Sequence, residues 1–367
     1  MSARVLVAMS GGVDSSVAAA ILRERGYDVV GVAMRLAPEP PAGTGRGKAT
    51  CCSHDDFEDA RRVAERMDFP FYVVDLREDF AARVIGNFVG EYLAGRTPNP
   101  CVMCNREIKF DRLRSRARAL GADFIATGHY ARIEQGVDGR PRLMRARDAA
   151  KDQSYFLFAT GRDELSRTLF PLGAMTKDEV RARARRLGLR NADKPESQEI
   201  CFVPDNDYAA FVRRSALSRT PAPGRIVNSD GRELGRHPGV HHFTVGQRRG
   251  LGIASGEPLY VREIRAARGE VVVGRKSELN ARGLVAGQVN LLDPELAGGR
   301  ETPVEVKIRY RHPGLPATLR MIDGARAEVR FASEGPAVTP GQACVFYRGD
   351  EVLGGGFIAQ AIAEAAP

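Results

Sequence analysis

The first two-thirds of the chain alternates short apolar runs with longer amphipathic segments. Four runs have the length and apolar, β-branched character of strands, namely residues 4–9, 28–34, 71–75 and 122–127. Three segments between them are typical of helices, namely residues 15–25, 55–68 and 106–120. This alternation predicts an α/β fold with a parallel sheet and helices on both faces.

The last third has a different pattern. Residues 304–311 alternate strictly between apolar and charged positions, and 327–331 and 343–347 are similar short runs separated by Pro and Gly. Period-two alternation of this kind predicts a small antiparallel β-barrel. We therefore expect three domains, an α/β domain over 1–210, a small central domain over 211–280 and a C-terminal β-barrel over 281–367.

Composition narrows the functional class only slightly. The chain has 367 residues, 43% of them hydrophobic, and a formal charge of +9, which favours a polyanionic partner but is weak evidence alone. No stretch of 18 apolar residues and no signal peptide is present, so we expect a cytoplasmic protein that does not associate with membranes. Six cysteines are too few for a disulfide scaffold, so they should be thiols, metal ligands or catalysts.

The motif SGGVDSS at residues 10–16 follows the first strand and opens a helix. Glycines allow close backbone approach and a helix N-terminus carries partial positive charge, so this turn is suited to bind phosphate. We expect Asp14 either to orient a loop N–H group or to help hold a Mg²⁺ ion carried by a nucleotide. Neither GxxxxGK[ST] nor GxGxxG is present here. The simpler alternative is a tight turn with an N-capping serine.

Two cysteine motifs carry further candidate chemistry. Cys101 and Cys104 form a CxxC after a Pro-rich turn, and Arg106 and Lys109 follow them on the predicted helix. A helix N-terminus and nearby cations lower a thiol pKa, so Cys104 is a candidate nucleophile, although CxxC alone does not separate redox, metal and nucleophilic roles. Cys201 lies in SQEICF. Of the remaining cysteines, Cys51 and Cys52 are expected to be loop thiols, and Cys344 is expected to be a core residue.

The SGGVDSS turn resembles the pyrophosphate loop (PP-loop) of the ATP pyrophosphatase superfamily, with its adenine nucleotide α-hydrolase-like fold. Six motifs, SGGVDSS, TPNPCVMCNREIKF, ATGHYAR, KDQSYFL, KPESQEICF and FTVGQRRGLGI, occur in order. Together they resemble the tRNA-specific 2-thiouridylase (MnmA, or TrmU) family over almost the whole chain. The resemblance implies an ATP site made by Ala8, Met9, Ser10, Gly11, Gly12, Val13, Asp14, Ser15, Met34 and Gly128.

The resemblance also implies a reaction. Family members 2-thiolate the wobble uridine of tRNAs for Lys, Glu and Gln. ATP, with Mg²⁺, adenylates the C2 oxygen and releases pyrophosphate, and sulfur from a cysteine persulfide then displaces AMP. By motif position Cys201 would carry the persulfide and Cys104 would be the nucleophile, and the two could end as a disulfide.

Position 101 departs from the commoner family pattern, which has Asp. In one interpretation Cys101 either transfers a proton or contacts the target base together with Asn99 and Pro100. In the other, Cys101, Cys104 and Cys201 hold a [4Fe–4S] cluster that binds sulfide, as in some related tRNA thiolases.

Basic residues are concentrated in residues 106–118 and 177–190 and at Arg140, Arg142, Arg145 and Arg147. Each run is either a solvated helix face or a contact for an RNA phosphate backbone. Family resemblance adds seven candidate tRNA contacts, His129, Lys151, Asp152, Gln153, Arg309, Tyr310 and Gln342.

The implied partners are tRNA and a cysteine desulfurase or sulfur-relay protein as persulfide donor, and a monomer is the default. Two alternatives remain. Another ATP pyrophosphatase, such as an amidotransferase or an argininosuccinate-type synthetase, does not explain the three cysteines. A non-catalytic RNA-binding protein with a relic nucleotide fold does not explain the intact loop, Cys104 and Cys201.

Overall fold

The computed structural model describes residues 2–36, 54–195, 200–203, 206–216 and 222–363. The chain divides into two compact units. The first contains Met1–Val84, Cys101–Asn206 and Asp350–Val352, and the second contains Ile85–Pro100, Asp207–Gly349 and Leu353–Pro367. Each unit is therefore built from separate stretches of sequence.

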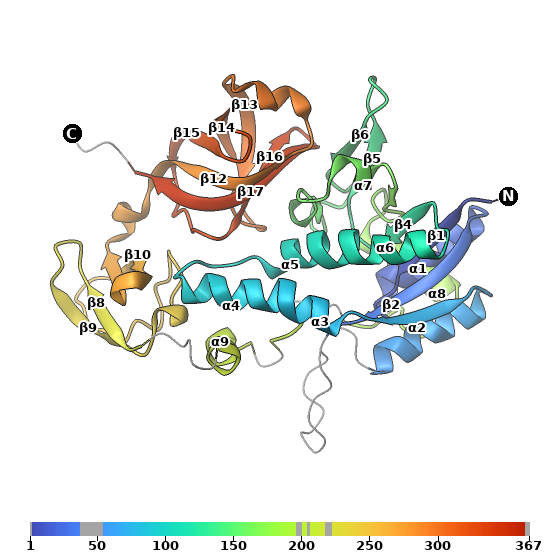
Figure 1. Ribbon diagram of the computed structural model, residues 1–367, viewed down its shortest axis with the longest axis horizontal. Coiled ribbons are helices and arrows are strands. Elements are labelled where there is room, and N and C mark those ends of the chain that lie inside the picture. The colour runs from blue at the N-terminus through green and yellow to red at the C-terminus, as the bar shows by residue number, and fades with distance from the viewer. Residues whose placement is uncertain (1, 37–53, 196–199, 204–205, 217–221, 364–367) are drawn as a thin grey trace, which may run out of the picture. The chain divides into compact units, whose positions relative to one another are not determined.

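A five-stranded parallel sheet forms the centre of the first unit, in the order β3-β2-β1-β4-β7 (Figure 1). Its strands are β1 (Arg4–Ala8), β2 (Asp28–Arg35), β3 (Phe71–Asp75), β4 (Phe124–Thr127) and β7 (Thr168–Leu169). The central strand β1 is apolar on both faces, and Val5, Leu6 and Val7 are fully buried. This matches the prediction from the sequence, because a parallel strand covered on both sides needs a continuous apolar run.

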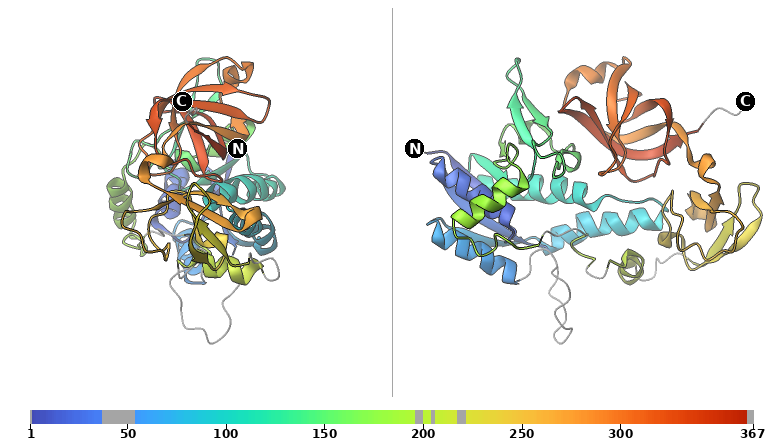
Figure 2. Two further views of the ribbon diagram at one scale, coloured as in Figure 1. Left: turned by 90° about the vertical axis from the view of Figure 1, so that its left-hand side faces the viewer. Right: turned by 180° about the vertical axis from the view of Figure 1, so that it is seen from behind.

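Helices α1 (Val13–Glu24), α2 (His54–Arg66) and α8 (Lys177–Arg186) share one core with β1 and β2. Small residues at Ala18 and Ala19 of α1 are fully buried there. Helix α6 (Leu113–Ala119) lies on the opposite side of the sheet (Figure 2). The remaining helical elements of this unit are short: α3 (Arg77–Phe80), α5 (Pro100–Met103), η3 (Ser154–Phe156) and α7 (Arg162–Leu165). Among the described residues, no helix is long and apolar enough to cross a bilayer.

The predicted helix over 106–120 begins earlier than the sequence pattern indicates. Helix α5 starts at Pro100 and runs directly into a π-helical segment, η2 (Cys104–Arg112), and then into α6. Proline favours the first helical position because its missing N–H is not needed there. Cys104 therefore lies one turn inside a continuous helical stretch, and Cys101 occupies its first turn.

A hairpin of β5 (Arg132–Gln135) and β6 (Pro141–Met144) completes the first unit. Its outer strand pairs with the start of β17 (Glu351–Ile362), where Met144 faces Glu351. Arg145 N donates to Asp350 O at 2.8 Å, and Arg142 forms an ion pair with Glu351 at 3.3 Å. Three residues from near the C-terminus thus belong to the first unit.

The described part of the second unit contains two longer helices and a small mixed sheet. Helix α4 (Gly86–Leu93), which follows the π-helical turn η1 (Ala81–Ile85), packs on α9 (Tyr208–Ala216), with Tyr92 and Tyr208 stacked at 4.7 Å between ring centroids. The sheet has the order β10-β11-β8-β9. Its strands and short helical turns are β8 (Gly224–Val227), β9 (Glu233–His237), η5 (Val240–His242), β10 (Tyr260–Arg265), η6 (Ala266–Arg268), β11 (Glu270–Gly274) and η7 (Lys276–Leu279).

A closed antiparallel barrel makes up the rest of the second unit. Strand order β12-β15-β14-β13-β16-β17 returns to β12 through a further β12–β17 pairing, so the barrel has no open edge there. The elements are β12 (Ala281–Leu291), η8 (Pro294–Gly298), β13 (Thr302–Lys307), β14 (Leu315–Met321), β15 (Ala327–Gly335) and β16 (Ala343–Arg348). The predicted alternation is confirmed, because Val304 and Val306 point into the core. The strand ends at Lys307, earlier than the pattern indicates, because the chain turns over residues 308–311, where His312 N donates to Arg309 O at 3.1 Å.

Three histidines of the second unit, His237, His241 and His242, lie close together. His241 is 1% exposed, and within the described residues neither of its ring nitrogens has a hydrogen-bond partner. Burial lowers the pKa of His241 to about 4, and the charges of His242, Arg213 and His237 act in the same direction. The folded chain therefore keeps this imidazole neutral at a pH where the unfolded chain protonates it.

Acidification should destabilise the protein through His241. Between its ordinary pKa of 6.5 and the folded value of about 4, the unfolded chain binds more protons, so stability falls as pH falls. At pH 5 this costs about 2 kcal/mol of unfolding free energy. Urea unfolding followed by circular dichroism at pH 7.5 and pH 5 should show a smaller acid loss for His241→Leu than for wild type. Replacement of His54, exposed on α2, should leave the acid loss unchanged, and equal losses for wild type and His241→Leu would contradict the assignment.

Candidate nucleotide and thiol site

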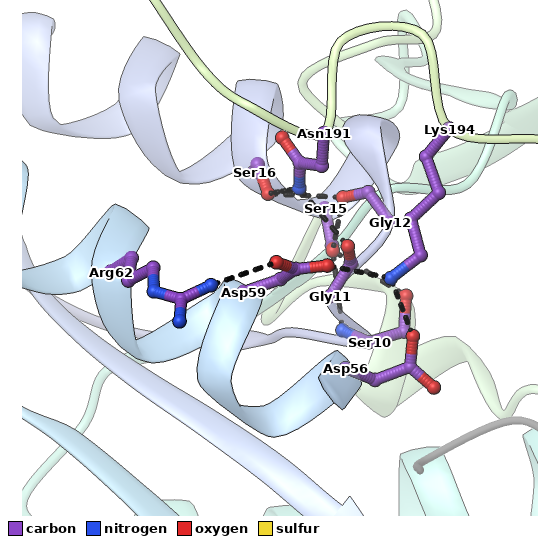
Figure 3. A network of polar contacts seen from close by, with 10 residues as sticks. All are labelled: Ser10, Gly11, Gly12, Ser15, Ser16, Asp56, Asp59, Arg62, Asn191 and Lys194. Carbon is purple, nitrogen blue, oxygen red and sulfur yellow. Dashed lines mark hydrogen bonds and ion pairs between the residues drawn. The ribbon is translucent and has the colours of Figure 1, made fainter. Parts of the chain in front are cut away.

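The turn between β1 and α1 is stabilised by hydrogen bonds between its own serine side chains and its backbone. Ser15 accepts from Ser10 N at 3.2 Å and donates to Gly12 O, and Ser16 also donates to Gly12 O (Figure 3). Ser15 and Ser16 are buried, so Ser10 is the exposed hydroxyl of the motif. The N-cap is Gly12, with no side-chain cap, which excludes the alternative of a serine-capped turn. An uncapped helix N-terminus after a glycine turn is a ready anion site.

Gly11 has to be glycine. Its φ is +71°, and a Cβ on it would lie 2.3 Å from the backbone oxygen of Asp56. Helix α2 therefore packs directly on the loop through its main chain. This close approach also brings the carboxylates of Asp56 and Asp59 next to the loop (Figure 3).

The segment that follows α8 crosses the loop and supplies two contacts that sequence reasoning missed. Asn191 donates through Nδ2 to Gly11 O and to Ser16 Oγ, both at 3.0 Å. Lys194 Nζ lies 2.7 Å from both Asp56 Oδ1 and Asp59 Oδ2. Burial opposes the charge of Lys194, but hydrogen bonds to the two carboxylates outweigh it and raise its pKa. Lys194 is therefore a permanent cation beside the phosphate loop.

Asp14 has partners other than those expected from the sequence. Its Oδ1 accepts from Tyr130 Oη at 2.8 Å, and both carboxylate oxygens lie 2.8 Å from Lys177 Nζ. The carboxylate thus orients no loop N–H group, and its oxygens are engaged by Lys177 and Tyr130. The side chain of Lys177 is only 9% exposed. Of the two alternatives for the 177–190 run, a solvated helix face is therefore wrong for Lys177, since this residue begins α8 and points at the loop.

A second glycine also lies directly against the loop. Gly128 follows β4, and a Cβ there would lie 2.7 Å from Ser15 N and 2.9 Å from Asp14 C. Met34 is 7% exposed, two residues beyond Val32, whose carbonyl accepts from Met9 N at 2.8 Å. The structure brings the expected loop residues and Gly128 together, with Met34 near the end of the neighbouring strand.

The cysteines occupy three kinds of environment. Cys101 is exposed, and Cys104 and Cys201 are half-buried. Cys344 is fully buried in the barrel core, where burial raises its pKa to about 12, as expected for a core residue. Cys51 and Cys52 lie outside the described residues. Among the described residues, no three His, Cys, Asp or Glu side chains form a metal-binding group. Cys101, Cys104 and Cys201 therefore do not present the ligand geometry of a [4Fe–4S] site.

Arg106 and Lys109, the cations that follow Cys104 in the sequence, each have a partner other than a thiol. Arg106 binds Glu107 at 2.9 Å, and Glu107 also binds Arg83 at 2.8 Å. Lys109 Nζ lies 3.4 Å from His129 Nε2. Cys104 lies one turn inside the helix and not at its first residue, so the partial charge of the helix N-terminus acts on its thiol less strongly than expected.

His129 and residues 151–153 (KDQ) belong to the first unit, like the nucleotide loop. Thr127 Oγ1 lies 2.6 Å from His129 Nδ1, and burial together with the charge of Lys109 lowers the pKa of His129 well below 6.5. The imidazole is therefore neutral at pH 7. Asp152 is buried and accepts hydrogen bonds from Ala146 N and Ser154, while Gln153 Oε1 accepts from Tyr130 N at 2.9 Å. These two KDQ side chains organise the loop that carries Tyr130.

The other expected tRNA residues belong to the second unit. Arg309 donates to Ala337 O at 2.9 Å, and Gln342 Nε2 donates to Thr97 O and Pro98 O. In the first unit, half of the basic residues within the two runs form ion pairs, for example Arg112 with Asp79 and Arg185 with Asp193. Among the described residues, four exposed arginines of these runs have no ion pair, Arg116, Arg118, Arg186 and Arg190.

Three family models match the chain in order. Residues 3–205 match a tRNA methyl transferase HUP domain, 211–275 a tRNA methyl transferase PRC-barrel domain and 281–358 an aminomethyltransferase β-barrel domain. The chain is 55% identical over 363 residues to a protein of Geotalea uraniireducens named tRNA-specific 2-thiouridylase MnmA, covering 98% of this chain and 96% of that one. The chain belongs to the MnmA family.

A protein of the same name from Geobacter metallireducens is 54% identical and covers 98% of both chains. Among solved structures, a 4-thiouridine synthetase–RNA complex with bound ATP aligns with a TM-score of 0.38 at 17% identity, covering 59% of this chain and 51% of that one. The family resemblance drawn from the six motifs is confirmed. So is the predicted architecture, with a parallel sheet, a small central domain and an antiparallel barrel.

Removal of the Lys177 amine should damage the loop. Lys177→Met leaves the Asp14 carboxylate without its cation, which should cost about 2 kcal/mol of stability after allowance for its partial exposure. ATP affinity, measured by calorimetry, should fall at the same time because the first turn of α1 loses its support. Arg186→Met on the same helix, at an exposed arginine without an ion pair, is the matched control and should change neither quantity. Unchanged melting and ATP binding in Lys177→Met would contradict this role.

A methyl group at position 128 should block the site. In Gly128→Ala the new Cβ meets Ser15 N at 2.7 Å, so the loop has to shift and ATP binding should weaken at least about tenfold. Gly90→Ala is the control, because a Cβ at Gly90 meets nothing within 4 Å. Equilibrium dialysis with labelled ATP measures both, and equal affinities for the two variants would show that the loop does not bind the nucleotide.

Proposed function

We propose that the protein is an ATP-dependent tRNA-uridine 2-sulfurtransferase that acts on the wobble uridine of tRNAs for Lys, Glu and Gln. The observation that carries the proposal is one unit that holds both a phosphate loop without a side-chain cap and two partly exposed cysteines, Cys104 and Cys201. Proteins that share about half of its residues along nearly its whole length are named tRNA-specific 2-thiouridylase. We also propose the domain boundaries 1–210, 211–280 and 281–367, which the three family models support.

The first step activates the uracil. The C2 oxygen attacks the α-phosphorus of ATP, an O–P bond forms, and the α–β bond breaks to release pyrophosphate. Loop N–H groups and Lys194, which lies beside the loop, would bind the phosphates, and Mg²⁺ bound to the nucleotide would neutralise charge on the leaving group. Because AMP is a far better leaving group than oxide, C2 becomes open to attack by sulfur.

The second step transfers sulfur. The terminal sulfur of a Cys201 persulfide attacks C2, and AMP leaves with the original oxygen. The Cys104 thiolate then attacks the sulfur of Cys201, and the S–S bond of the persulfide breaks so that its electrons form the thiocarbonyl. The products are 2-thiouridine and a Cys104–Cys201 disulfide, which a dithiol reductant has to open before the next turnover.

The remaining site residues are proposed with their family roles. Asn99, Pro100 and Cys101 would contact the target base, with the exposed Cys101 thiol in the position of the commoner carboxylate. His129, Lys151, Asp152, Gln153, Arg309, Tyr310 and Gln342 would contact the tRNA directly or support the segments that do. A cysteine desulfurase or sulfur-relay protein would supply the persulfide to a monomeric, cytoplasmic enzyme.

Substitution of the persulfide cysteine separates the two steps. With ATP, a persulfide donor and unmodified tRNA, Cys201→Ser should form no 2-thiouridine, yet should still release pyrophosphate, because adenylation does not need sulfur. Asp14→Ala should lose both reactions. Nucleoside analysis of digested tRNA and a pyrophosphate assay measure the two steps in one sample.

Cys344→Ala is the control, since this buried thiol lies in the barrel core and should leave both steps intact. Wild-type thiolation in Cys201→Ser would contradict the persulfide assignment. A wild-type protein that binds tRNA but neither releases pyrophosphate nor thiolates would instead support the non-catalytic RNA-binding alternative.

A further inference from the structure

A short segment between α4 and α5 leads to the residues proposed to contact the target base. Residues 95–98 precede Asn99, and Pro98, Asn99 and Pro100 are buried. This segment has no regular secondary structure, so its own backbone hydrogen bonds do not fix it. Its position depends on contacts with distant parts of the second unit.

The barrel supplies several of these contacts through three adjacent residues, Pro340, Gly341 and Gln342. Gln342 Nε2 donates to two successive carbonyls, Thr97 O at 3.0 Å and Pro98 O at 3.1 Å. Thr97 N donates in return to Pro340 O at 2.8 Å. Gly341 has a φ of +89°, and a Cβ there would lie 2.8 Å from Thr97 O and 2.9 Å from Thr97 N. We call Gly341 and Gln342 the clamp.

The clamp is itself fixed to the barrel wall. Gly341 N donates to Ile358 O, and Ile358 N donates to Gln342 O, both at 2.8 Å, so β17 holds the backbone of both residues. A side-chain amide is suited to this position because its nitrogen carries two N–H groups that can serve two carbonyls at once. A carboxylate of the same shape would present only acceptors to the same carbonyls.

Further contacts link the segment to a candidate RNA contact. Thr97 Oγ1 donates to Thr244 Oγ1 at 3.2 Å, and Thr339 Oγ1 donates to the neighbouring Val245 O at 3.3 Å. Thr339 also accepts from Arg309 at 3.3 Å. A continuous set of polar contacts therefore runs from Arg309 to the segment that carries Asn99.

We propose that Gln342, together with Gly341, is a positioning residue that fixes the target-base segment. The proposal rests on the proposed function, and it assigns Gln342 a different role from direct recognition of RNA. The amide acts through the carbonyls of Thr97 and Pro98, so that Asn99 and Pro100 are already in place when the uridine enters. Pre-organisation of this kind affects the rate of the bound complex more than the affinity for tRNA.

Three variants test the clamp by different routes. Gln342→Ala removes both hydrogen bonds, Gln342→Glu keeps the shape but reverses the polarity, and Gly341→Ala pushes the segment away while it keeps the amide. Gln360→Ala, at an exposed glutamine of β17, is the matched control. Each protein is measured for tRNA affinity, for thiolation rate at saturating tRNA and for amide hydrogen exchange in the peptide that contains residues 95–99.

The three clamp variants should bind tRNA within about twofold of wild type yet thiolate at least about tenfold more slowly at saturation. Amide exchange at 95–99 should become faster in free protein, with no change in Gln360→Ala. A higher tRNA dissociation constant with a full rate at saturation would overturn the proposal and make Gln342 an RNA contact. Unchanged exchange at 95–99 would overturn it as well. If wild type does not thiolate tRNA at all, the proposed function fails, and the exchange measurement still decides whether the clamp exists.

Discussion

The ion pair between Asp14 and Lys177 holds together the parts on which the nucleotide site depends. Lys177 is almost completely removed from water, and an ammonium group in that position is stable only with a charged partner. Because Asp14 lies in the first turn of α1 and Lys177 at the start of α8, the pair fixes these two helix ends against one another. The chain beyond α8 then returns to the loop through Asn191 and Lys194 and continues to Cys201. The loop, both helices and the thiol-bearing segment are thus parts of one arrangement.

The charges around the loop give the site an unexpected balance. Lys177 and Lys194 face three carboxylates, those of Asp14, Asp56 and Asp59. These five side chains together carry no net positive charge, although the whole chain carries +9. The attraction for phosphate therefore comes mainly from backbone N–H groups at the start of α1, which are oriented rather than charged. Geometry matters more than charge here, which is why glycines at positions 11 and 128 are required.

The sequence was a good guide to the elements and a poorer guide to side-chain partners. Apolar runs and strict alternation predicted β1, β2, β3 and the barrel strands, because burial on one or two faces leaves a periodic pattern. Position along the chain also placed the phosphate turn correctly. Lys177 was grouped with a solvent-facing basic run because its neighbours on α8 are arginines, and no local signal shows that the first residue of the helix turns inward. Tyr130, Asn191 and Lys194 reach the site only through the tertiary fold. The start of the helix at Pro100 was missed because the apolar period begins several residues later.

The first unit includes residues from near the C-terminus, which affects the order in which the protein can fold during synthesis. Residues 350–352 supply the last strand contact of the β5–β6 hairpin, with Glu351 opposite Met144. A chain that leaves the ribosome from its N-terminus therefore has the sheet, the phosphate loop and all three site cysteines long before that edge can be covered. Domains generally fold in the order in which they are synthesised, but this one has to wait for almost the entire barrel. During translation the hairpin edge is an exposed pairing surface, and its arginines, Arg140 and Arg142, are the kind of charged residue that discourages contact with another chain.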